Sequence, residues 1–237
     1  MTETGSGVRR HDYSDREALA IALAAGIAAQ LAGAIAERGE AALAVSGGST
    51  PKTLFKVLSE TEIAWDRVTV ILVDERICPP DSERANQRLV RERLLTGHAA
   101  KAHFTAFETG LATPDENARR SAELFATVAW PLDVAVLGMG TDGHTASFFP
   151  GGDMLDRALD PDSGERVVPM RADGAGEPRL TLTLPVLLDA RFLALHIEGE
   201  EKRAVFETAL GGNDVRAMPV RAVLQQEKTP IHVFWAP

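Results

Sequence analysis

The sequence predicts an α/β fold in which helices cover both faces of a mostly parallel sheet. Three observations lead to this prediction. Short apolar runs, rich in β-branched residues, alternate with helical segments along most of the chain. The runs are apolar on both faces, as strands buried between two layers of helices are. Four of them end directly in a polar or glycine-rich cluster, and open parallel sheets bind their ligands at such strand ends.

Strands are predicted where the apolar runs are too short to be helices. The four that end in polar clusters are AALAV at residues 41–45, VTVILV at 68–73, LDVAVL at 132–137 and FLALHI at 192–197. Shorter strands are predicted at residues 167–168 and 180–184, and a last strand at 231–235.

Helices are predicted in the longer segments between the strands. The first, residues 18–36, is rich in alanine and interrupted by Gly26, Gln30 and Gly33, so we expect a buried helix and no membrane contact. Pro51 suits the first position of a helix that reaches about residue 60. Further helices are predicted at residues 83–95, at 117–127, and after the strand at 192–197 as far as residue 210. No repeat or domain boundary is visible, which predicts a single domain over residues 1–237.

The composition narrows the possible classes of function. Cys78 is the only cysteine, so no intrachain disulfide can form and a reducing, cytoplasmic setting is expected. The N-terminal residues lack the apolar run of a signal peptide. The net charge is −9 and no basic stripe is visible, which argues against a nucleic-acid partner. An anionic ligand would need locally placed cations and backbone dipoles.

The strand at residues 41–45 ends in a loop that can bind phosphate. Its residues are Ser46, Gly47, Gly48, Ser49 and Thr50. The glycines allow the backbone to approach a ligand closely, Ser49 or Thr50 can cap the next helix, and the first amides of that helix can hold an anion. The alternative is a tight turn with an ordinary helix cap. Pro51 stands where a Walker loop needs its second glycine, so nucleoside triphosphates are disfavoured.

The strand at residues 132–137 ends in GMGTDGH, which matches the G-x-G-x-x-G pattern of dinucleotide sites. The segment HTASFFPGG that follows leaves room for two helical turns at most, and no strand with an acidic end lies about 20 residues further on. A nicotinamide site is therefore not predicted. The turn instead presents Asp142 and His144, a carboxylate beside a histidine suited to act as a general base near neutral pH. The alternative is a turn histidine with a structural role. The other histidines lack metal-ligand spacing, so no metal is predicted.

Charged residues at the other strand ends are candidates for ligand binding. Asp74 and Arg76 follow the strand at 68–73 and can bind a polyhydroxyl or anionic ligand, or form a surface ion network of little energy. Lys202 lies in the first turn of a helix, where the dipole disfavours a cation, so it either binds the ligand's phosphate or is offset by Glu200 and Glu201. Arg179 is a second candidate for the phosphate, or a solvent-facing charge.

Five segments together resemble the 6-phosphogluconolactonase family of the bacterial, single-domain type. They are SGGSTP, VDER with a proline-containing loop and Asn86, LGMGTDGHTASFFPG, RLTLTLPVLLDA, and EGEEK. The resemblance covers nearly the whole chain, and the fourteen-residue core of its third segment is the most specific part. It implies a Rossmann-like three-layer sandwich with a mostly parallel central sheet. It also implies hydrolysis of 6-phospho-D-glucono-1,5-lactone in the pentose phosphate pathway, with His144 as general base and no metal or organic cofactor.

The expected mechanism combines these residues. His144 takes a proton from the water that attacks C1, while Asp142 holds the imidazole tautomer. The amides of residues 138–143, or Arg76, stabilise the oxyanion, and the sequence does not decide between them. The loop at residues 46–50, with Arg179 and Lys202, binds the phosphate. If His144 is not the base, Asp142 and Asp74 are the next candidates.

Two rival functions and one open question remain at this level. Glucosamine-6-phosphate deaminases carry a glutamate where this chain has Phe149, and a tyrosine where it has Arg76. A non-catalytic sugar-phosphate sensor would need a partner domain, and the roughly 15 residues before the first helix are too few for a helix-turn-helix.

The ICPP sequence after Arg76 and the lack of a tyrosine after Asn86 depart from the family and affect expected affinity. Oligomeric state is not predicted.

Overall fold

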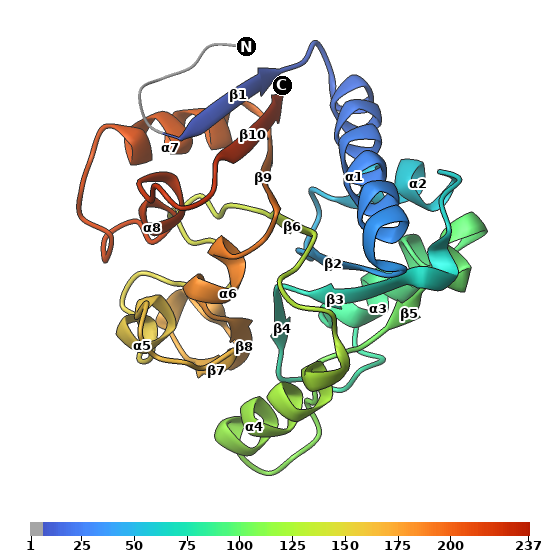
Figure 1. The fold of residues 1–237 in the computed structure, drawn as a ribbon. Helices are drawn as coiled ribbons and strands as arrows, with labels where there is room; N and C mark the ends of the chain where they lie inside the picture. Colours follow the sequence, from blue (N-terminus) through green and yellow to red (C-terminus); the bar gives the residue numbers. More distant parts are fainter. Residues whose placement is uncertain (1–6) are drawn as a thin grey trace.

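The computed structural model describes residues 7–237 and contains a large parallel sheet (Figure 1). Within these residues the sheet has seven strands: β1 (Val8–Asp12), β2 (Ala41–Val45), β3 (Val68–Leu72), β5 (His103–Phe104), β6 (Val134–Leu137), β9 (Phe192–Glu198) and β10 (Ile231–Ala236). Their order is β1-β10-β9-β6-β2-β3-β5, and every neighbouring pair is parallel. The predicted α/β fold with a mostly parallel central sheet is confirmed.

Three short strands form a second sheet that the sequence analysis did not separate from the first. They are β4 (Asp74–Arg76), β7 (Val167–Met170) and β8 (Arg179–Leu182), in the antiparallel order β4-β8-β7. The chain passes between the sheets at Val73, whose N–H donates to Val45 O at 3.0 Å and whose carbonyl accepts from Leu182 N at 2.9 Å. The strands predicted near residues 167 and 180 thus lie in this second sheet, because β4 leaves the parallel sheet and pairs with β8, which in turn pairs with β7.

The alanine-rich segment forms α1 (Arg16–Arg38), a long helix beside the central sheet. The Asp15 side chain accepts a hydrogen bond from Ala18 N at its start, and Gly39 ends it with a φ of 83°. By length and composition alone this helix could cross a membrane. In the fold its apolar face, including Leu23 and Ile27, is fully buried in the core, as the sequence analysis predicted for this segment.

The remaining helices surround the two sheets. In chain order they are α2 (Lys52–Ser59), α3 (Asn86–Arg93), α4 (Pro114–Leu124), α5 (Leu155–Leu159), α6 (Leu184–Leu188), α7 (Glu200–Leu210) and α8 (Arg221–Leu224), with short 3₁₀ turns η1 (Trp65–Arg67), η2 (Gly97–Lys101), η3 (Phe125–Thr127) and η4 (Asp173–Ala175). In Figure 1, α1 and α2 lie to one side of the central sheet and α7 and α8 to the other.

Two helix starts differ from the sequence prediction for identifiable reasons. α4 begins at Pro114 because Thr113 and Glu116 form a capping box, each side chain bonding the other's backbone N–H. α3 begins at Asn86, later than expected, because residues 77–85 before it form bends and turns. Its first amides bond a buried carboxylate, described below.

The strand order brings the four polar clusters to one edge. β9, β6, β2 and β3 are consecutive and parallel, so their carboxyl ends lie side by side. The loops after these strands therefore meet where the sequence analysis expected a site, and the second sheet closes the far end of the same edge through β4 and β8.

Candidate active site

A cavity of about 210 Å³ lies at the carboxyl ends of these strands. The predicted residues that line it are Ser46, Gly47, Gly48, Ser49, Thr50, Asp74, Arg76, His144, Arg179 and Lys202. Asp142 does not line the cavity but contacts His144 from behind. One cavity thus brings together residues from the loop after β2, from β4, β8 and α7, and from the loop after β6, which are far apart in the sequence.

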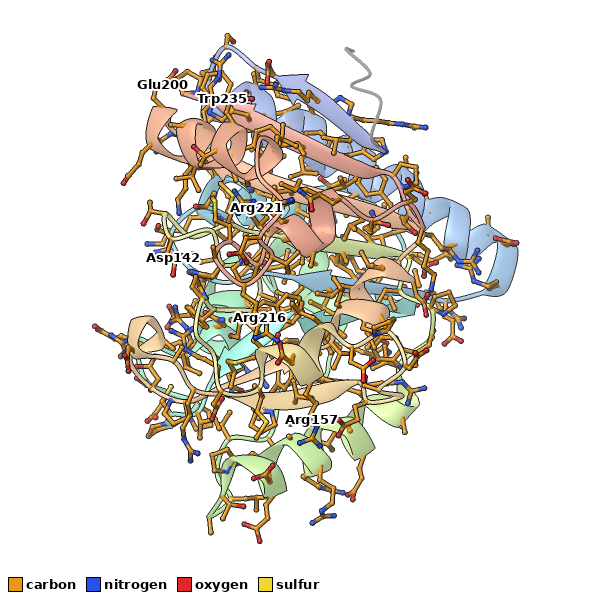
Figure 2. All side chains as sticks on the ribbon, turned by 90° about the vertical axis from the view of Figure 1, so that its left-hand side faces the viewer. Asp142, Arg157, Glu200, Arg216, Arg221 and Trp235 are labelled. Carbon is orange, nitrogen blue, oxygen red and sulfur yellow. The ribbon has the colours of Figure 1, made fainter. Side chains whose placement is uncertain are left out.

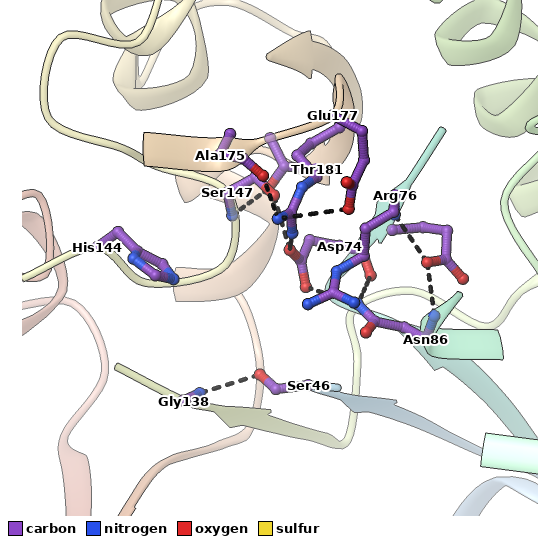
Figure 3. Close-up of polar contacts among 12 residues, drawn as sticks. Ser46, Asp74, Arg76, Asn86, Gly138, His144, Ser147, Ala175, Glu177 and Thr181 are labelled. Atoms are coloured by element: carbon purple, nitrogen blue, oxygen red, sulfur yellow. Dashed lines mark hydrogen bonds and ion pairs between the residues drawn. The ribbon is translucent and has the colours of Figure 1, made fainter. Parts of the chain in front are cut away.

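The loop after β2 is fixed to the loop after β6. Ser46 Oγ donates to Val136 O at 3.0 Å. It also accepts from Gly138 N at 3.0 Å (Figure 3). Gly48 has a φ of 89°, a conformation that favours glycine. The expected cap is absent, since neither Ser49 nor Thr50 hydrogen-bonds the start of α2, which follows Pro51 directly. The first-turn amides of α2 therefore carry no side-chain cap, unlike those of α1.

Gly47 is required by a close contact with Asn86. A Cβ atom at position 47 would lie 2.0 Å from Asn86 Oδ1, well inside van der Waals distance. The phosphate-loop candidate therefore packs its backbone directly against a side chain at the start of α3.

The His144 imidazole is held by Asp142. Nδ1 of His144 lies 2.6 Å from Asp142 Oδ1, and the same oxygen accepts the His144 backbone N–H at 3.1 Å. Burial raises the pKa of the Asp142 carboxyl, but the hydrogen bond and charge of His144 outweigh it, so the net pKa is lowered. An ionised Asp142 requires a proton on Nδ1, which leaves Nε2 as the acceptor. The Phe149 ring packs 4.3 Å from the His144 ring, centroid to centroid, on the other side.

Figure 2 shows Asp142 near the outside of the molecule. Its side chain is 42% exposed, whereas that of His144 is 30% exposed. The carboxylate thus lies on the solvent side and the imidazole lies between it and the cavity.

Asp74 is buried and fully engaged by neighbours. Its Oδ2 accepts from Ser147 Oγ at 2.6 Å, and its backbone carbonyl accepts from Asn86 Nδ2 at 3.0 Å (Figure 3). The Arg179 guanidinium lies 3.8 Å from Oδ2. The chain bends at Ala146, which has a φ of 47°, and this brings Ser147 to the carboxylate from the loop that carries His144.

Two arginines face the cavity from adjacent strands. Arg76 and Arg179 are directly opposite in the β4–β8 register, so their side chains leave the same face of the second sheet. Burial lowers the pKa of Arg179, and Arg76 adds to this while Asp74 opposes it. The Nε atoms of both arginines are buried without a hydrogen-bond partner within residues 7–237. Two like charges with free donors at one place are suited to bind an anion.

Lys202 reaches the same space from α7. Its Nζ donates to Met139 O at 2.5 Å. This hydrogen bond places the Lys202 ammonium beside the turn that contains His144. Burial lowers the pKa of Lys202, while Asp142 and Glu201 oppose that change. The position of this lysine predicted either an anionic ligand or an offset by Glu200 and Glu201, and the structure adds the Met139 carbonyl as a partner.

Four residues near the site had no assigned role at the sequence level. Asn86 and His196 line the cavity, Ser147 bonds Asp74, and Glu75 lies on β4 with its side chain bonded to the Asn86 amide. His196 is buried in β9 and contacts Glu198 at 3.1 Å. His196 lies within the apolar run at residues 192–197, which predicted a buried strand, so nothing in the sequence marked it as a site residue. In the described part of the chain, residues 7–237, no three His, Cys, Asp or Glu side chains form a group able to hold a metal ion.

Comparison with known proteins identifies the family. The profile described as glucosamine-6-phosphate isomerases/6-phosphogluconolactonase matches residues 14–235. The chain belongs to this family. The resemblance seen in the sequence is thereby confirmed.

Relatives in this family match the chain over nearly its full length. A 6-phosphogluconolactonase of Rhizobium meliloti is 51% identical, covering 96% of this chain and 98% of its own. One of Mesorhizobium japonicum is 48% identical, covering 98% and 97%. A crystal structure of a 6-phosphogluconolactonase from Shewanella baltica superposes with a TM-score of 0.94 at 42% identity, covering 97% of this chain and 98% of that one.

Proposed function

We propose that the protein hydrolyses 6-phospho-D-glucono-1,5-lactone to 6-phospho-D-gluconate. The observation that carries the proposal is the 2.6 Å contact between His144 Nδ1 and Asp142 at the edge of a cavity lined by three cationic side chains. The names of the relatives support the same lactone. The proposal includes that the protein acts in the oxidative pentose phosphate pathway and in the cytoplasm.

The reaction needs a base, a site for the oxyanion and a hold on the phosphate. His144 Nε2 accepts a proton from water as the oxygen attacks C1, and the imidazolium that forms is stabilised by Asp142. Collapse of the tetrahedral intermediate breaks the bond from C1 to the ring oxygen, which takes the proton back from His144. Base catalysis of this kind contributes about 10²- to 10⁴-fold in rate.

The anionic groups are assigned to the cations of the cavity. Arg179 and Lys202, with the backbone of residues 46–50, would hold the phosphate and fix the ring against His144. The buried Nε of Arg179 has no protein partner within residues 7–237 and is free to donate to it. Arg76 and the amides of residues 138–143 both remain candidates for the oxyanion.

Phe149 argues against deaminase chemistry at this site. The residue is buried and its ring lies against His144, at the position where the deaminases carry a carboxylate. No acid is therefore present there to open a sugar ring. No observation favours the sensor hypothesis over catalysis.

The test is hydrolysis of freshly prepared lactone, coupled to 6-phosphogluconate dehydrogenase and corrected for spontaneous opening. We expect rapid turnover that EDTA does not affect, and a loss of at least about 100-fold in His144→Ala. His103→Ala, an exposed histidine on β5, is the matched control and should keep wild-type activity. Full activity in His144→Ala would move the base elsewhere, and a wild-type rate no faster than the background would refute the proposal.

A further inference from the structure

Glu75 is a buried carboxylate that the proposed mechanism does not use. It lies on β4 between Asp74 and Arg76, and since strand side chains alternate, it points away from the cavity that they line. Its side chain is completely buried. No basic side chain within residues 7–237 forms an ion pair with it.

Three backbone amides surround this carboxylate. Oε1 accepts from Arg76 N and Asn86 N, and Oε2 accepts from Gln87 N, each at 2.7 Å. The last two amides open α3, so the carboxylate occupies the start of that helix from a neighbouring strand. Burial, with Asp74 adding to it, raises the pKa of Glu75 to about 7 despite the three amides, which lower it.

The groups held by Glu75 are the ones that shape one wall of the cavity. The Asn86 side-chain Nδ2 donates to the backbone carbonyl of Asp74. The same side chain packs on Gly47 of the loop after β2, where no Cβ would fit. Arg76 projects into the cavity from the residue after Glu75 (Figure 3). One carboxylate therefore connects Arg76, Asp74 and the glycine loop through a few short contacts.

We propose that Glu75 is a positioning residue, which sets the Arg76 and Asn86 side chains in the cavity by fixing the backbone amides of residues 76, 86 and 87. This inference rests on the proposed lactonase function. The role requires both carboxylate oxygens, because three amides must be accepted. A glutamine offers one acceptor oxygen, and its NH₂ group would face at least one of these N–H donors.

The first experiment compares wild type with Glu75→Gln at pH 8, where the native carboxyl is ionised. We expect kcat to fall about 10- to 100-fold, since small displacements of groups around a reacting centre have effects of that size. KM should stay within about 3-fold, because Arg179 and Lys202 do not contact Glu75. The Tm should not fall, because the variant no longer buries an unpaired charge.

The second experiment is a double-mutant cycle with Asn86→Ala. If Glu75 acts through Asn86, the double variant should lose little more kcat than Asn86→Ala alone. Additive losses would overturn this route of action. A merely structural role would instead lower Tm while leaving kcat per folded molecule unchanged, and that result would also overturn the inference.

The outcomes separate this inference from the proposed function. An active wild type with an equally active Glu75→Gln variant refutes the positioning role alone. A wild type without turnover refutes the lactonase proposal, and the positioning role falls with it. Glu227→Gln, an exposed glutamate with no side-chain partner within residues 7–237, controls for loss of one acidic charge.

Discussion

Replacing Glu75 with glutamine should remove a pH dependence of stability that this carboxyl imposes on the native protein. The pKa of Glu75 is raised from its ordinary 4.5 to about 7, mainly by burial. Between these values the native state holds a proton that the unfolded chain has lost. The free energy of unfolding therefore falls as pH rises from 4.5 to about 7, and this contribution is constant outside that window.

The magnitude follows from the two pKa values. Their difference corresponds to about 3 kcal/mol over the full window, most of which lies between pH 5 and pH 8. Other groups titrate in the same range, so the quantity to compare is the difference between wild type and variant. Relative to wild type, Glu75→Gln should gain about 2 to 3 kcal/mol when the pH is raised from 5 to 8. The variant also loses the acceptor for one amide, which costs about 1 kcal/mol of stability. This cost is the same at every pH, so it cancels when the stability differences at pH 5 and pH 8 are compared.

Urea unfolding at pH 5, 6, 7 and 8 measures this difference directly. The m value should be the same for both proteins, so that a change in midpoint reports stability. Glu227→Gln should follow the wild-type curve at every pH. A constant difference between Glu75→Gln and wild type from pH 5 to 8 would refute the reasoning, because it would mean that Glu75 titrates alike in both states.

Two further predictions concern the site. Asp142→Asn should lower kcat by about 10²- to 10⁴-fold with little change in KM, since an amide cannot hold His144 in the required tautomer or stabilise its charged form; steady-state kinetics check this, and unchanged kcat would contradict it. Gly47→Ala should displace Asn86 and lower both activity and Tm, because the added methyl would lie 2.0 Å from Asn86 Oδ1. Its control, Gly33→Ala on α1, meets nothing within 4 Å and should stabilise the helix by up to about 1 kcal/mol; equal Tm changes in the two variants would refute the steric argument.

Local patterns were enough to find the main strands. β2, β3, β6, β9 and β10 are short apolar runs with clear ends, because each is buried on both faces along most of its length. Strands without that signal were missed. β1 reads VRRHD and lies at the edge of the sheet, where polar side chains reach solvent.

The sequence predicted many of the residues that line the cavity, but not the contacts between them. Strand ends in a parallel sheet share one edge, so the sequence alone indicated that the clusters after β2, β6 and β9 would meet. The Arg76–Arg179 pairing could not be inferred, since it depends on β4 leaving the parallel sheet to join β8. The expected cap by Ser49 or Thr50 was wrong because Pro51 takes the N-cap position of α2 and has no side-chain oxygen to accept a hydrogen bond.

The sequence by itself determined the fold class, the family and many of the residues that line the cavity, because these depend on local apolar runs and on the composition of short loops. Only the tertiary structure decided which side chains support them. The roles of Ser147 and Glu75 arise from contacts between segments 73 and 11 residues apart along the chain. A buried carboxylate acquires its partners and its raised pKa from tertiary packing. The residues next to Glu75 in the sequence do not show which distant segments pack against it.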